Sequence, residues 1–129
     1  MNLVIDASAW VEYFDGSILG EKVKELVEST EHQVFTNVLT IAELSSHYQK
    51  KKVDFGKVRE IIISLSSIFP IDISFAEEAG TLHAEQRRER KSISLGDIFV
   101  LLTARKISGK IVTKDEDFRG LSEALFVGR

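Results

Sequence analysis

The sequence predicts an α/β fold, a three-layer α/β/α sandwich around a central parallel sheet of about five strands. Short apolar, β-rich runs alternate along the chain with longer segments whose apolar residues recur at helical spacing. No glycine- or serine-rich linker, repeat or low-complexity tract divides the chain, and its 129 residues suit a single domain spanning residues 1–129. Strands separated by helices imply right-handed crossovers, and therefore a parallel sheet covered on both faces.

The first part of the chain contains two predicted strands and three predicted helices. A buried strand at residues 3–5 precedes a helix at about 8–14, which a glycine and a serine bring to an end. Apolar residues at helical spacing then predict a second helix at about 18–27. A short strand at 34–36 leads into a helix at about 41–51.

The second part repeats this alternation. Helices are expected at about 54–67 and, from the apolar spacing of Phe75, Ala79 and Leu82, over a long segment that ends near a basic cluster. A third helix is expected at 94–105, opened by Ser94. The remaining strands are expected at residues 68–71, 110–113 and 124–127.

Composition gives few constraints on partners. The chain has no cysteine, so disulfides and thiolate metal sites are impossible. The longest apolar run, residues 98–102, is too short to span a bilayer, and no signal-peptide pattern begins the sequence, so we expect a cytoplasmic protein without a membrane association. The net charge of −3, taken alone, disfavours nucleic acid. However, if four of the 20 acidic residues hold metal, 17 basic residues face 16 acidic ones, so the charge decides nothing.

Four acidic residues map to one edge of the predicted sheet. Asp6 closes the first strand and Asp115 lies two residues beyond the fourth, while Glu43 and Asp97 fall in the first turns of helices that start from the same edge. Carboxylates gathered there repel one another unless a cation compensates their charge. Because all the donors are oxygens, Mg²⁺ or Mn²⁺ is the expected cofactor, as one ion or two.

Each acid also has a structural explanation. Glu43 and Asp97 stand three residues after Thr40 and Ser94, a spacing that matches helix capping boxes. Asp6 can cap the helix that follows it, and Asp115 can be a turn residue. The joint placement of the four acids at one edge favours the metal interpretation.

Further candidates surround these acids. Asp117 is either a fifth ligand or an exposed turn acid, and Ser8 and Thr113 either bond the carboxylates or serve as a cap and a strand end. A basic cluster at the end of a helix either complements the helix dipole or contacts the phosphates of a substrate. The residues of this cluster predicted to bind substrate are Arg87, Arg88, Arg90 and Lys91.

Four motifs together resemble a known family. They read VIDAS at residues 4–8, TIAEL at 40–44, ISLGD at 93–97 and IVTKDEDF at 111–118. In their order and spacing they look like the successive motifs of PIN-domain nucleases, and the length of the chain is similar to that of the VapC toxins of toxin–antitoxin pairs. The resemblance covers nearly the whole chain.

The resemblance implies a PIN-like fold and Mg²⁺- or Mn²⁺-dependent hydrolysis of RNA. Carried over by position, Asp6, Glu43, Asp97 and Asp115 match the family's acidic quartet, and Asp117 matches an acid that often assists. We expect Asp6, Glu43 and Asp97 to bind metal directly, with Asp115 completing the site or orienting the attacking water. The family also implies a homodimer and inhibition by a cognate antitoxin protein.

Two other function classes compete with the nuclease. A receiver-type phospho-acceptor domain has a similar size and an acidic rim, but it needs adjacent acids after the first strand, where Asp6 stands alone, and an acceptor aspartate after the third, whereas Asp54 falls between helices. A non-catalytic RNA- or protein-binding scaffold with the same fold is disfavoured by the intact quartet. Within the nuclease class, the sequence fits both a toxin and a housekeeping RNA-processing enzyme.

Overall fold

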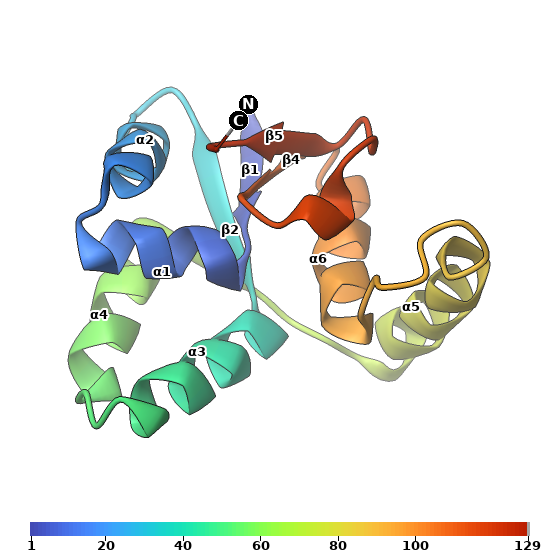
Figure 1. Ribbon diagram of the computed structural model, residues 1–129, viewed down its shortest axis with the longest axis horizontal. Helices are drawn as coiled ribbons and strands as arrows, with labels where there is room; N and C mark the ends of the chain where they lie inside the picture. Colours follow the sequence, from blue (N-terminus) through green and yellow to red (C-terminus); the bar gives the residue numbers. More distant parts are fainter. Residues whose placement is uncertain (129) are drawn as a thin grey trace.

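The computed structural model describes residues 1–128 and shows one sheet with helices on both sides (Figure 1). The strands are β1 (Asn2–Ile5), β2 (Gln33–Asn37), β3 (Ser67–Phe69), β4 (Lys110–Thr113) and β5 (Ala124–Phe126). The helices are α1 (Ala7–Asp15), α2 (Ile18–Val27), α3 (Val38–Lys50), α4 (Phe55–Leu65), α5 (Ile73–Gln86), α6 (Leu95–Lys106) and the short 3₁₀ helix η1 (Glu116–Phe118). Within the described residues, no helix combines the length and apolar character needed to cross a membrane.

All five strands run parallel, in the order β3-β2-β1-β4-β5. This arrangement confirms the predicted α/β class and its central parallel sheet of five strands. From β1 the chain first winds outward through β2 to β3, then returns across the sheet to place β4 and β5 on the other side of β1. The winding direction therefore reverses between β1 and β4, and in open parallel sheets the crevice at such a point, outside the carboxyl ends of the strands, is where ligands bind.

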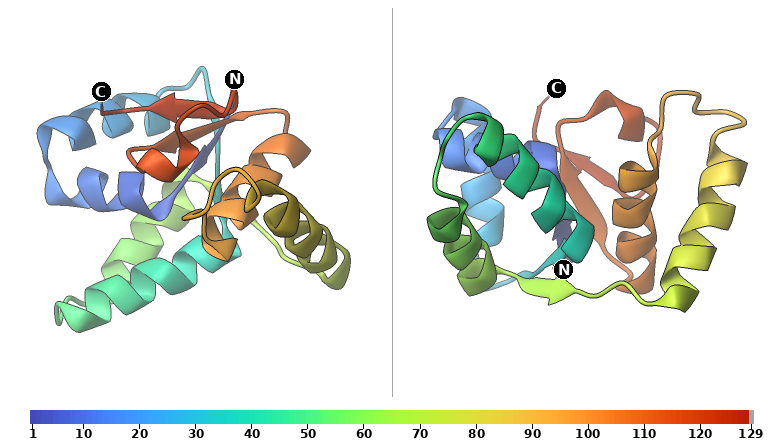
Figure 2. Two further views of the ribbon diagram at one scale, coloured as in Figure 1. Left: turned by 45° about the vertical axis from the view of Figure 1, so that its right-hand side comes forward. Right: turned by 90° about the horizontal axis from the view of Figure 1, so that it is seen from below.

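Two apolar clusters hold the three layers together. Alternate residues of β1 point to opposite faces, so Leu3 and Ile5 pack into the cluster formed with α1, α2, α3 and α4. Val4 packs with α5 and α6 on the other face. Figures 1 and 2 show the same division, with the first four helices on one side of the sheet and the last two on the other. Because Leu3, Val4 and Ile5 are buried on both faces of the sheet, this part of β1 is apolar without alternation.

The start of α3 differs from the prediction. The expected capping box between Thr40 and Glu43 is wrong, because the helix begins at Val38 and its N-cap is Asn37. The Asn37 side chain accepts a hydrogen bond from the Leu39 N–H at 2.7 Å and donates one to Thr103 of α6 at 2.9 Å. Glu43 consequently lies in the second turn of α3 and has no capping role.

Asn37→Ala tests this link between α3 and α6. The substitution removes both a helix cap and a fully buried hydrogen bond, and we expect the free energy of unfolding to fall by about 2 kcal/mol. Asp54→Ala is the matched control, because Asp54 caps α4 at an exposed site, with an expected loss of about 1 kcal/mol. Urea denaturation measures both, and equal losses would show that the buried bond to Thr103 contributes nothing.

Candidate metal centre

The carboxyl edge of the sheet gathers acidic side chains from four parts of the chain. Asp6 directly follows β1 and Asp115 follows β4, so the two flank the point where the strand order reverses. Glu43 reaches this edge from α3, and Asp97 from the first turn of α6. Acids that are distant in the sequence therefore meet at one edge of the sheet.

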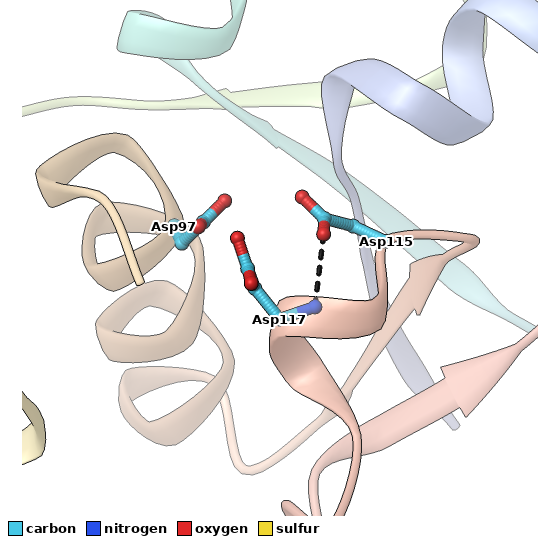
Figure 3. Close-up of side chains that lie close together, drawn as sticks. All are labelled: Asp97, Asp115 and Asp117. Atoms are coloured by element: carbon cyan, nitrogen blue, oxygen red, sulfur yellow. Dashed lines mark hydrogen bonds between the residues drawn. The ribbon is translucent and has the colours of Figure 1, made fainter. Parts of the chain in front are cut away.

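The tightest group contains three acids. Asp97, Asp115 and Asp117 each present an oxygen, and these oxygens all lie within 4.8 Å of one another. Figure 3 shows the three carboxylates, one from α6 and two from the β4–η1 segment, turned toward a common space. From the sequence, Asp117 was either a fifth ligand or an exposed turn acid. In the structure it belongs to the group of acids that lie closest together.

Asp6 forms the buried floor of the site. Only 5% of its surface is exposed, and its carboxylate accepts hydrogen bonds from Ser8 Oγ at 2.8 Å, from the Ala9 N–H at 2.9 Å and from Thr113 Oγ1. Burial is the main cause that raises the pKa of Asp6 to about 6, and the charge of Asp115 acts in the same direction, whereas these hydrogen bonds lower the pKa. The hydrogen bonds from the protein therefore compensate the negative charge of Asp6 only in part.

Glu43 interacts electrostatically with both Asp6 and Asp97, so it joins Asp6 to the three-acid group. Burial raises the pKa of Glu43, and so do the charges of Asp97 and Asp6. The pKa of Asp97 is likewise raised by burial and by Asp115 and Asp117, although its hydrogen bonds with Ser94 act in the opposite direction. The five acids thus form a continuous chain of mutually repelling charges, which a positive ion would relieve.

Three of the acids take part in helix capping as well as in this cluster. Asp6 caps α1, Asp115 caps η1, and Asp97 forms a complete capping box with Ser94. In the box, Asp97 Oδ2 accepts a hydrogen bond from the Ser94 N–H at 3.0 Å, which leaves its other oxygen available. The capping and metal interpretations are therefore compatible, because a cap fixes the orientation of the carboxylate that a metal would use.

The donor set fits a hard divalent cation. All five side chains are carboxylates, which suit Mg²⁺ or Mn²⁺ better than softer ions. Burial, together with repulsion from neighbouring carboxylates, raises the pKa values of Asp6, Glu43 and Asp97 and so disfavours their charged forms. Binding of such an ion would therefore relieve the repulsion between these carboxylates and be favoured by it.

Hydroxyl groups hold the acids in place. Thr113 and Ser8 both donate to Asp6, and Ser8 also accepts a hydrogen bond from the Lys114 N–H at 3.2 Å. Ser92, which sequence reasoning missed, donates to Asp117 Oδ1 at 2.5 Å. No signal in the sequence marks Ser92, because this contact joins the loop before α6 to η1, and the two residues are 25 positions apart.

The predicted substrate-binding cluster divides into two kinds of side chain. Arg87 donates to the carbonyl of Ile93 at 3.4 Å, and Arg90 donates to the carbonyl of Arg119 at 2.5 Å. Arg88 and Lys91 are exposed, and so is Arg87, whereas Arg90 is half-buried. The loop that carries Arg88 and Lys91 is linked to the acid cluster by the hydrogen bond from Ser92 to Asp117. Both basic side chains therefore lie on a loop attached to the site.

The fold and its acids define an α/β domain with a carboxylate-lined candidate metal centre at the switch point of a parallel sheet. Residues 3–124 match the PIN domain family. The chain therefore belongs to the PIN domain family, as its four motifs suggested. No significant match was found among curated proteins.

Several solved structures share this fold at low sequence identity. A toxin–antitoxin complex from Klebsiella pneumoniae is 20% identical, with a TM-score of 0.73 and coverage of 97% of both chains. The toxin VapC20 from Mycobacterium tuberculosis, described as cleaving the sarcin–ricin loop, is 17% identical, with a TM-score of 0.75 and coverage of 94% of this chain and 95% of that one. VapBC2 from Rickettsia felis, solved with a promoter DNA fragment, is 17% identical, with a TM-score of 0.74 and coverage of 98% and 97%.

Proposed function

We propose that this protein is a metal-dependent endoribonuclease that hydrolyses RNA phosphodiester bonds at the acid cluster. The observation that carries the proposal is the meeting of Asp97, Asp115 and Asp117 within 4.8 Å, beside Asp6 and Glu43, at the switch point of a PIN domain. Isolated caps or turn acids would not need to converge in this way. The non-catalytic scaffold has no use for a group of carboxylates that destabilise one another.

Each acid has a proposed part in catalysis. Asp97, Asp115, Asp117, Glu43 and Asp6 would hold one or two Mg²⁺ or Mn²⁺ ions. Such an ion supplies positive charge to the phosphate oxygens and makes a water molecule more acidic. The capping hydrogen bonds of Asp6, Asp97 and Asp115 fix their carboxylates before substrate arrives. The site therefore does not have to order these side chains during the reaction.

The RNA would approach along the loop between α5 and α6. Arg87, Arg88 and Lys91 are exposed there and would contact the phosphate backbone, while the half-buried Arg90 mainly holds the loop against the carbonyl of Arg119. Single-stranded or looped RNA suits this open site, because its backbone can enter without unwinding.

We also propose that the protein is the toxin of a toxin–antitoxin pair and acts as a homodimer in the cytoplasm. The similarity of the whole chain to structures described as toxin–antitoxin complexes supports this proposal. A small gene next to its own, encoding a protein that binds the chain and blocks cleavage, is the expected antitoxin. A housekeeping RNA-processing enzyme would have no such neighbour, and expressing it alone would not arrest growth.

Glu43→Gln tests the proposed nuclease activity. We expect the wild-type protein to cleave single-stranded RNA with Mg²⁺ or Mn²⁺ and to stop when EDTA is added. Because the substituted amide carries no charge, the variant should be at least about 10²-fold slower. Labelled RNA oligonucleotides resolved on gels measure the rate, with a DNA of the same sequence as the comparison substrate.

The matched control for this experiment is Glu60→Gln, which makes the same change at an exposed position of α4. It should cleave at the wild-type rate. If the wild-type protein binds RNA but does not cleave it with any divalent cation, the scaffold interpretation replaces the nuclease.

A further inference from the structure

The first turn of α6 comes very close to the carboxylate of Glu43. A β-carbon placed on Gly96 would lie 2.7 Å from Glu43 Oε2 and 3.5 Å from Glu43 Cδ. A carbon atom cannot approach an oxygen as closely as 2.7 Å, so the absence of a side chain at Gly96 is what leaves room for the carboxylate. Asp97, the next residue, belongs to the three-acid group.

The backbone conformation does not explain this glycine. Gly96 is the second residue of α6 and has no positive φ, so any amino acid can adopt its conformation. Glycine is moreover a poor helix former compared with alanine. A residue that weakens the helix and is not required by its geometry needs another explanation, and the contact with Glu43 provides one.

The other close-packed glycines differ from Gly96 in what they face. A β-carbon on Gly20 would meet the backbone carbonyl of Glu12, and one on Gly109 would meet the backbone of Asn2. Glycine at those two positions allows main-chain segments to pack closely, and a side chain there would push the neighbouring backbone away. At Gly96 the obstacle is the end of a flexible side chain, so a substitution would displace only the Glu43 carboxylate.

We propose that Gly96 is a positioning residue that lets the Glu43 carboxylate lie against α6 beside Asp97. The expected effect on catalysis rests on the proposed nuclease function, whereas the position of the Glu43 carboxylate against α6 does not depend on it. A methyl group at position 96 would push the carboxylate away from α6 and out of the acid cluster. The number of acids able to share a cation would then fall, although every acid would still be present.

Gly96→Ala tests the proposal, with Gly80→Ala as the matched control. Gly80 lies exposed in the middle of α5, and nothing lies within 4 Å of a β-carbon placed there. Both variants make the same change in a helix, and both should melt at least as high as the wild-type protein without metal. Only Gly96→Ala should raise the Mn²⁺ concentration needed for half-maximal cleavage, by about 10-fold or more.

A second measurement needs neither metal nor activity. The Glu43 side-chain carboxyl carbon, labelled with ¹³C and assigned by its loss in Glu43→Gln, should change its chemical shift in metal-free Gly96→Ala and keep it in Gly80→Ala. The melting-temperature increase caused by Mn²⁺ should also be smaller in Gly96→Ala than in Gly80→Ala.

The possible outcomes separate the two proposals. If Gly96→Ala matches Gly80→Ala in the carboxyl resonance and in its response to Mn²⁺, the positioning role of Gly96 is overturned. If the resonance moves but the wild-type protein neither cleaves RNA nor responds to Mn²⁺, the nuclease proposal fails while the local geometry stands. A moved resonance together with a weakened Mn²⁺ response supports both.

Discussion

Asp6→Asn should lower the rate of RNA cleavage by at least about 10³-fold, equivalent to about 4 kcal/mol of transition-state stabilisation. Asp6 is the most buried of the five acids, and the substitution removes its charge from the floor of the site. The fold should survive, because the amide oxygen of asparagine can still accept from the Ala9 N–H and Ser8 Oγ. Asparagine is also as good an N-cap as aspartate.

Asp54→Asn is the matched control for this prediction. It makes the same change at another N-cap, at the start of α4 and at the far end of α3 from the acids (Figure 1). Cleavage rates measured with excess Mn²⁺ should distinguish the two variants, whereas the circular dichroism spectra of both should match that of the wild-type protein. An Asp6→Asn protein that folds normally and cleaves within about tenfold of the wild-type rate would contradict the proposed mechanism.

The fold could be predicted because burial leaves a strong pattern in this sequence. The residues Leu3, Val4 and Ile5 are all fully buried, and such a continuous apolar run is typical of a central parallel strand. Gly16 was expected to end the first helix, and it does so with φ at 65°, a conformation that suits glycine. Phe75, Ala79 and Leu82, spaced for one helix face, all lie in the core.

The start of α3 was mispredicted because Thr40 with Glu43 supplied a local capping signal that the structure does not use. Thr40 with Glu43 matches a capping box, while Asn37 matches a simple cap. The choice depends on Thr103, which lies 66 residues away and accepts a hydrogen bond from Asn37 inside the core. Local sequence does not contain that information.

The acid cluster could be predicted only in part, because topology fixes some of its members and loop conformation fixes the others. Topology places residues that follow parallel strands at one edge, so Asp6 and Asp115 could be paired from the sequence. Which acids approach most closely depends on loop conformation, and the close group includes Asp117 but neither Asp6 nor Glu43. The contact between Gly96 and Glu43 joins two helices that are distant in the sequence and likewise required the structure.

The metal-free protein should become less stable as the pH rises through about 6, and Asp6 should be the main cause. Its folded-state pKa of about 6 is above the ordinary value of 3.8, so the folded protein holds the proton more tightly than the unfolded chain does. This contribution is fully present below pH 3.8 and is lost as the pH rises through about 6. Since Asp6 is almost completely buried, the shift corresponds to about 3 kcal/mol.

The cleanest measurement is the difference in unfolding free energy between Asp6→Asn and the wild-type protein in EDTA, because titration of the other groups largely cancels. The variant should gain up to about 3 kcal/mol relative to wild type between about pH 4 and pH 7.5. Adding Mn²⁺ at about pH 7.5 should reverse the order, since the ion stabilises only a folded protein whose site can bind it. A difference that stays constant with pH would mean that Asp6 carries no uncompensated charge, and the main physical reason for a cation at this site would then be lost.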